Sequence, residues 1–112
     1  MSLESDLQAL LASAGAAYQD IAPPSAPAPY IVWAEVVSSI NNSLQGASAT
    51  QNTRVQIDCY AATPATRQVL ADAVVAAMAA ASFSNVQLTS QNLYEAEAKL
   101  FRASLDYSVW ST

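Results

Sequence analysis

The stretch Thr53-Arg54-Val55-Gln56-Ile57-Asp58-Cys59-Tyr60-Ala61 alternates apolar and polar side chains along its length. In an extended chain, the apolar members fall on one face: Val55, Ile57 and Cys59. The polar members fall on the opposite face: Arg54, Gln56, Asp58 and Tyr60. This period of two is typical of a strand with one face in the core and the other face open. The segment therefore predicts a half-buried sheet.

Three further segments read as strands of the same sheet. Residues 30–37 are rich in β-branched and aromatic side chains, and residues 86–97 form a second extended segment. Residues 100–110 alternate as cleanly as 53–61. Their core-facing set is Phe101, Ala103, Leu105, Tyr107 and Val109, and their open-facing set is Arg102, Ser104, Asp106, Ser108 and Trp110. A turn near Ala98-Lys99 would join the last two strands as a hairpin.

Two helices complete the pattern. Leucines recur at spacings of three and four over residues 3–14, and Gly15 is a plausible helix terminator in the left-handed conformation. Thr63-Pro64 is a strong helix start, because Thr caps free amides and Pro fits the first helical position. The second helix then has one apolar face: Leu70, Ala73, Val74, Ala77, Met78 and Ala81.

Two connecting segments stand out from these elements. Residues 22–29 contain four prolines and read as an extended connector inside one domain, with a proline-motif docking site as the alternative. Residues 38–52 form a polar, uncharged loop that is longer than a hairpin needs. We interpret this loop as an interaction arm, with a disordered tip as the alternative.

The order of elements, α-β-β-α-β-β, predicts an α+β fold of two layers. An antiparallel sheet of about four strands has the two helices on one face. At 112 residues the chain has room for one core, so we expect residues 1–112 to form a single domain.

Composition excludes several classes of function. The nine acidic residues exceed the four basic ones, which gives a net charge of −5, and no run of Lys or Arg occurs. Binding to phosphates of DNA normally needs a basic stripe, so sequence-specific nucleic-acid binding is not expected. The most apolar window, 69–81, is too short and too interrupted for a membrane span.

The sequence offers little for catalysis. It contains no His, one Cys and only two glycines, so the commonest general base, a metal cluster and a phosphate loop all lack support. Cys59 lies at a core-facing position and reads as a buried structural thiol. Asp58 and Asp106 share the open face with Arg54 and Arg102, which predicts cross-strand ion pairs there. We expect no enzyme activity and no cofactor.

Aromatic side chains are more informative about contacts with other proteins. Tyr60 and Trp110 fall on the open face, whereas Trp33 could belong to the core or to an interface. The chain is 53% hydrophobic and only 12% charged, which favours burial of surface against partner chains. Our candidate interaction residues are Ile40, Asn41, Asn42, Leu44, Gln45, Tyr60 and Trp110.

Three motifs occur in order along the chain: Pro29-Tyr30-Ile31-Val32, then 54–60 as R-x-Q-I-D-x-Y, and 104–110 as S-x-D-Y-x-V-W. Together with the Ala-rich helix between the last two, they resemble the tail completion proteins of long-tailed bacteriophages. The resemblance implies a subunit of a ring, usually hexameric, that ends the growing tail tube and joins it to the capsid. The implied partners are other copies of the chain, the tail tube protein and a head–tail connector protein.

The same resemblance implies assembly in the cytoplasm of the bacterial host and residence in the virion tail, with a prophage as a possible source of the gene. It carries over no catalytic residues. An alternative function uses the same open sheet face: a module that binds a small ligand or a peptide, which would be a stable monomer.

Overall fold

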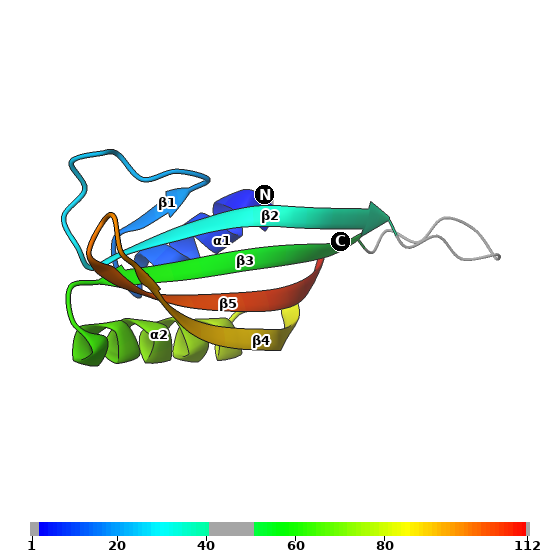
Figure 1. The fold of residues 1–112 in the computed structure, drawn as a ribbon. Helices are drawn as coiled ribbons and strands as arrows, with labels where there is room; N and C mark the ends of the chain where they lie inside the picture. Colours follow the sequence, from blue (N-terminus) through cyan, green and yellow to red (C-terminus); the bar gives the residue numbers. More distant parts are fainter. Residues whose placement is uncertain (1–2, 41–50, 112) are drawn as a thin grey trace, which may run out of the picture.

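A computed structural model of the chain describes residues 3–40 and 51–111. Two helices and five strands follow one another in the order α1 (Leu3–Ala12), β1 (Ala17–Gln19), β2 (Tyr30–Ile40), β3 (Gln51–Ala61), α2 (Pro64–Ala79), β4 (Ser84–Glu95) and β5 (Leu100–Ser111). The strands form one sheet in the spatial order β1-β2-β3-β5-β4 (Figure 1). The predicted α+β class is confirmed.

Strand β3 lies at the centre of the sheet, between β2 and β5, and is antiparallel to both. Its alternation works as predicted, because Val55, Ile57 and Cys59 are fully buried while Arg54 on the other face is exposed. Strand β5 repeats the pattern, with Ala103, Leu105, Tyr107 and Val109 buried on the same side. Strands β4 and β5 form the expected antiparallel hairpin.

Both helices cover this one apolar face (Figure 1). α1 contributes Leu7 and Leu11 to the core, and α2 contributes Leu70, Ala71, Val74 and Met78. The predicted cap is present, because the Thr63 hydroxyl accepts a hydrogen bond from the Thr66 backbone N–H at 3.1 Å, with Pro64 in the first turn. Within the part of the chain that the structure describes, no helix covers the opposite face.

Trp33 belongs to the core, which decides between the two readings of this residue. Its ring is fully buried, and its indole N–H donates a hydrogen bond to the Gln8 side-chain oxygen at 2.8 Å. The Gln8 amide in turn donates to the carbonyl of Ala17 at 2.9 Å. One polar side chain of α1 thus connects the helix to both β2 and β1.

The predicted role of Gly15 is wrong. α1 ends at Ala12, and Gly15 does not adopt the left-handed conformation. What the position needs is space, because a Cβ at Gly15 would lie 3.0 Å from Cδ1 of Leu70. Gly15 therefore lets the chain approach α2 closely.

The sheet is larger than the four predicted strands. Residues Ala17–Gln19 form the short strand β1, which pairs in parallel with Ile31–Trp33 of β2. A strand of three residues is too short to show alternation, so the sequence pattern missed it. Residues 22–29 contain neither helix nor strand and connect β1 to β2.

The segment predicted as a loop, 38–52, is in part strand. β2 continues to Ile40 and β3 begins at Gln51, so the backbone at 38–40 pairs with that at 51–53. Polar residues at these positions do not show the apolar alternation that marks the rest of the strands. The remaining loop residues, 41–50, lie outside the described residues.

Candidate interaction surfaces

The open face of the sheet carries charged side chains from three strands, and they pair with one another. Arg54 of β3 contacts Asp106 of β5 at 3.1 Å. Arg102 of β5 contacts Asp58 of β3 at 3.3 Å and Glu95 of β4 at 2.6 Å. The prediction of cross-strand ion pairs on this face is confirmed. Because these groups are in part exposed to water, their effect on stability is modest, and they chiefly define the charge of the surface.

Three tyrosines cluster at one end of the open face. Tyr30 and Tyr60 are direct cross-strand partners, and their rings stack with centroids 5.1 Å apart. Tyr18 of β1 meets Tyr30 edge to face at 6.2 Å, and the guanidinium of Arg102 lies 6.0 Å from the Tyr60 ring centroid. Burial, followed by the negative charge of Asp58, raises the pKa of Tyr60. The Tyr60 hydroxyl therefore stays neutral at physiological pH.

Tyr60 lines two separate hollows. The larger has a volume of about 520 Å³ and is lined by Tyr60, Glu95, Ala96, Glu97, Ala98 and Arg102. The smaller has a volume of about 240 Å³ and is lined by Asp20, Ile21, Ala22, Tyr30, Val32 and Tyr60. Sequence analysis assigned Tyr60 to this face but missed Tyr18 and Tyr30 as its neighbours.

The candidate interaction residues do not form one surface. Tyr60 and Trp110 both lie in the open-face register but at opposite ends of the sheet, since Tyr60 pairs with Arg102 and Trp110 pairs with Asn52. Ile40 is the last residue of β2, where its backbone pairs with Gln51. The other candidates lie outside the described residues: Asn41, Asn42, Leu44 and Gln45.

Strand β4 is a long edge strand with most of its side chains exposed. The exposed fractions of its large apolar side chains are 52% for Val86, 47% for Leu88, 38% for Leu93 and 54% for Tyr94. Its only charged residue is the terminal Glu95. Edge strands of soluble proteins are usually shortened or protected by Lys, Pro or charge, and β4 has little of this protection. The sequence predicted the strand but not its place at the edge.

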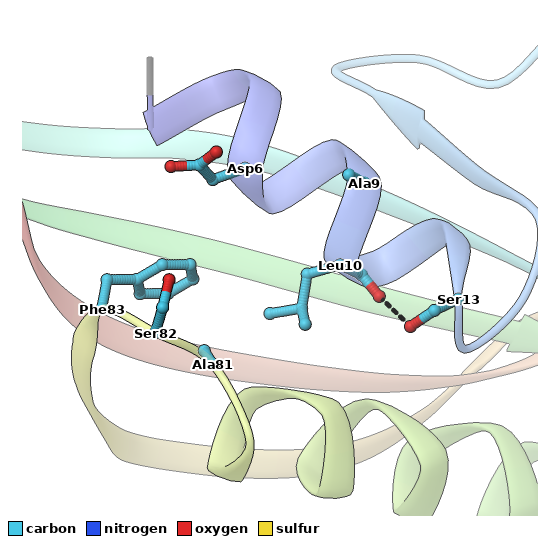
Figure 2. A pocket seen from close by; sticks show the side chains of 7 residues that line it. All are labelled: Asp6, Ala9, Leu10, Ser13, Ala81, Ser82 and Phe83. Atoms are coloured by element: carbon cyan, nitrogen blue, oxygen red, sulfur yellow. Dashed lines mark hydrogen bonds between the residues drawn. The ribbon is translucent and has the colours of Figure 1, made fainter. Parts of the chain in front are cut away.

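A third hollow, of about 350 Å³, lies on the helix side of the molecule. Figure 2 shows Leu10 of α1 pointing toward the segment 81–83, which follows α2. The lining residues are Asp6, Ala9, Leu10, Ser13, Ala81, Ser82 and Phe83. Serine nucleophiles need a neighbouring base, and the sequence has no His to serve as one. This hollow is a shallow groove between α1 and the end of α2, without a catalytic arrangement.

Cys59 is fully buried, as its core-facing position predicted. Burial raises the pKa of the Cys59 thiol to about 12, and the neighbouring Asp58 charge adds to the effect. A thiol in this state is neither a nucleophile nor a metal ligand at neutral pH.

Comparison with known proteins identifies the family. The family model described as "Tail completion protein gp17" matches residues 3–112, which is nearly the whole chain. The chain belongs to the tail completion protein gp17 family. The resemblance drawn from the three sequence motifs is thus confirmed. Membership makes this tail completion protein a structural component of a virion and not an enzyme.

Solved structures show the same fold. A chain from the structure described as "Virion of native gene transfer agent (GTA) particle" superimposes with a TM-score of 0.58 at 23% sequence identity. The alignment covers 93% of this chain and 82% of that chain. No curated protein matches the sequence at a significant level.

Two negative observations apply to residues 3–40 and 51–111 of this tail completion protein. No cluster of three or more His, Cys, Asp or Glu side chains there could hold a metal ion. No helix in those ranges has the length and apolar character needed to cross a membrane.

Proposed function

We propose that this tail completion protein is a ring-forming subunit that ends the growth of the tail tube and joins the tail to the capsid. Family membership supports a role in the tail. The single structural observation that carries the ring is the sheet with two open edges, because open edges are surfaces on which a second chain can add.

The two open edges lie on opposite sides of the sheet. Among residues 3–40 and 51–111, strand β4 has no neighbour beyond it, and β1 covers β2 only at Ile31–Trp33. From Ala34 to Ile40, β2 pairs only with β3 among the described residues. When β4 of one subunit meets β2 of the next, the contact is heterologous, and repeated rotation closes a ring.

Each open edge has a bulge with an exposed aliphatic side chain. Val36 is the extra residue of β2, and Leu88 is the extra residue of β4. Their exposed fractions are 52% and 47%. A bulge interrupts the ladder, so a neighbouring strand would pair with the regular stretch 89–95 and pack against Leu88. Leu88 is therefore the residue at which a charge should disturb the ring most directly.

Light scattering coupled to size exclusion, over a range of protein concentrations, tests the ring. We expect a closed oligomer near the hexamer that the family resemblance implies. Leu88→Lys should shift the subunits toward monomer, because a charge would be buried at the contact. Val69→Lys is the matched control, since Val69 is also exposed, at 69%, but lies on α2 and not on an edge strand.

Equal assembly of Leu88→Lys and the wild-type chain, with both folded by circular dichroism, would contradict edge pairing. The role at the tail end needs a separate readout. Electron microscopy of tails assembled without the chain should show tubes of variable length and few joined capsids. Tubes of normal length under those conditions would reject the terminator role.

A further inference from the structure

We propose that formation of the subunit contact at the β2 edge is coupled to the uptake of a proton by Glu35. The coupling rests on the proposed function, because Glu35 lies on the edge that a neighbouring subunit would cover. Its consequence is a ring that forms more readily in mild acid than at neutral pH.

Glu35 stands where the open edge of β2 begins. It is the second residue of the stretch 34–40, which pairs only with β3 among the described residues, and it directly precedes the Val36 bulge. Its cross-strand partner is Val55, which is fully buried, so Glu35 lies on the side of the sheet that the helices cover. A strand added to this edge would place its own side chains beside the Glu35 carboxyl and displace water from it.

The charged groups that act on Glu35 within its own chain are also acidic. Glu4 lies in the first turn of α1. Asp20 directly follows β1, and its backbone N–H donates a hydrogen bond to the carbonyl of Trp33 at 2.8 Å, two residues before Glu35. Partial burial raises the pKa of Glu35, and the like charges of Glu4 and Asp20 raise it further. Further loss of water at this position would favour the protonated carboxyl more strongly.

No base in the described part of the chain forms an ion pair with Glu35. Among residues 3–40 and 51–111, the ion pairs of Arg54 and Arg102 join β3, β4 and β5 on the open face of the sheet. Arg67 lies over the ring of Phe101. Glu35 therefore enters the contact without a cation from these three side chains.

The strand that the neighbouring subunit would add brings no cation either. The only charged residue of β4 is Glu95, which Arg102 of its own chain already holds at 2.6 Å. The β4 residues on the helix side of the sheet are all neutral: Asn85, Gln87, Ser90, Asn92 and Tyr94. A carboxylate enclosed between such neighbours is costly, and binding a proton removes that cost.

Light scattering coupled to size exclusion, at a fixed protein concentration between about pH 5 and about pH 7.5, tests the coupling. Because each contact takes up at most one proton, its association constant should rise by no more than about tenfold for each unit that the pH falls. We expect a rise of about three- to tenfold from pH 7 to pH 5 in the wild-type chain. Glu35→Gln should assemble about three- to tenfold more strongly than the wild-type chain at pH 7, with a weaker dependence on pH.

The matched control separates Glu35 from the general loss of negative charge in acid. Asp72→Asn removes the same charge from the exposed surface of α2, so it should keep the pH dependence of the wild-type chain. Circular dichroism at each pH checks that every variant is folded.

Equal pH dependence in Glu35→Gln and the wild-type chain would overturn the coupling, and so would equal gains from Glu35→Gln and Asp72→Asn. An oligomer that weakens in acid would also overturn it, because a base such as Lys99, in the turn after β4, would then pair with the charged Glu35. The edge contact itself is read separately from Leu88→Lys. A ring that Leu88→Lys disrupts but that ignores pH would reject only the coupling, whereas a chain that stays monomeric at every pH would reject the contact and the coupling together.

Discussion

Cys59 lies in the middle of the core, where the protein keeps its thiol protonated. Because burial raises its pKa to about 12, while a thiol in an unfolded chain titrates near about 8.5, the folded state binds this proton more tightly. Cys59 therefore contributes stability that is fully present below about pH 8.5 and is lost progressively as pH rises toward about 12.

Two measurements check this prediction. Alkylation by iodoacetamide near neutral pH should be at least about 100-fold slower in the folded chain than in urea, because the thiolate is the reacting form. Thermal melts should show a smaller alkaline loss of stability in Cys59→Ala than in wild type. Rapid alkylation of the folded chain would mean that the thiol is accessible and that the core opens readily at this point.

The fold disfavours the charged form of the Glu35 carboxyl. Partial burial raises its pKa above the ordinary 4.5, and the like charges of Glu4 and Asp20 raise it further. The folded state thus prefers protonated Glu35, so its stabilising effect is present below about pH 4.5 and is lost as pH rises.

Glu35→Gln should therefore stabilise the chain at pH 7, by less than about 0.5 kcal/mol because the residue is exposed. Urea titrations at pH 7 and at pH 4 measure the effect, and the gain should shrink at the lower pH. Glu4→Gln removes one of the two like charges and should give a smaller gain. A loss of stability in Glu35→Gln at pH 7 would show that this carboxylate has a favourable partner.

At the scale of elements, a part-buried hydrogen bond joins α1 to β2, in addition to the core contacts of Leu7 and Leu11. The Trp33 indole N–H donates to Gln8 at 2.8 Å and is otherwise enclosed by the core. Gln8→Leu should cost about 1 to 3 kcal/mol in the free energy of unfolding, because the buried donor loses its partner.

Urea unfolding measures this cost. Gln68→Leu is the matched control, since Gln68 is exposed on α2 and donates only to the Asp72 carboxylate beside it. The double variant Gln8→Leu, Trp33→Phe removes donor and acceptor together and should cost less in the free energy of unfolding than the sum of the two single variants. Equal costs in Gln8→Leu and Gln68→Leu would show that the bond to Trp33 contributes little.

Elements long enough to repeat their apolar pattern several times could be predicted from the sequence. Shorter elements could not. Strands β3 and β5 show a period of two because one face is buried and the other is open, and α2 starts at an unambiguous Thr63 cap. Strand β1 has only three residues, and its partner Ile31–Trp33 is fixed by the path of the chain, which no local pattern encodes. The same limit hid the tyrosine cluster, because Tyr18 reaches Tyr30 only through β1.

The position of β4 shows a second limit. Its residues favour extended backbone, but nothing in the sequence indicates that β5 pairs between β3 and β4 and leaves β4 outermost. The Leu88 bulge and the exposed aliphatic side chains acquire meaning only once that order is known. For the same reason, sequence reasoning placed its candidate contact residues in the loop 38–52, at Tyr60 and at Trp110, and named none in β4.

At the scale of the whole molecule, the net charge of −5 opposes contact between copies of the chain. The proposed edge contact offers no charge pairing to offset this repulsion, since β4 carries no charge before Glu95. Assembly by this contact should therefore depend on burial of apolar side chains, with electrostatics acting against it.

This balance predicts that salt promotes ring formation. At about 0.1 M ionic strength the Debye length is about 10 Å, so repulsion between exposed acids on neighbouring subunits is screened, while apolar burial at Leu88 persists. Light scattering at a fixed protein concentration should show a larger oligomeric fraction in moderate NaCl than in dilute buffer. In Leu88→Lys, added salt should restore little, because the defect is a buried charge and not long-range repulsion. Dissociation of the wild-type oligomer by moderate salt would indicate an interface held by ion pairs, and the edge contact would then have to be abandoned.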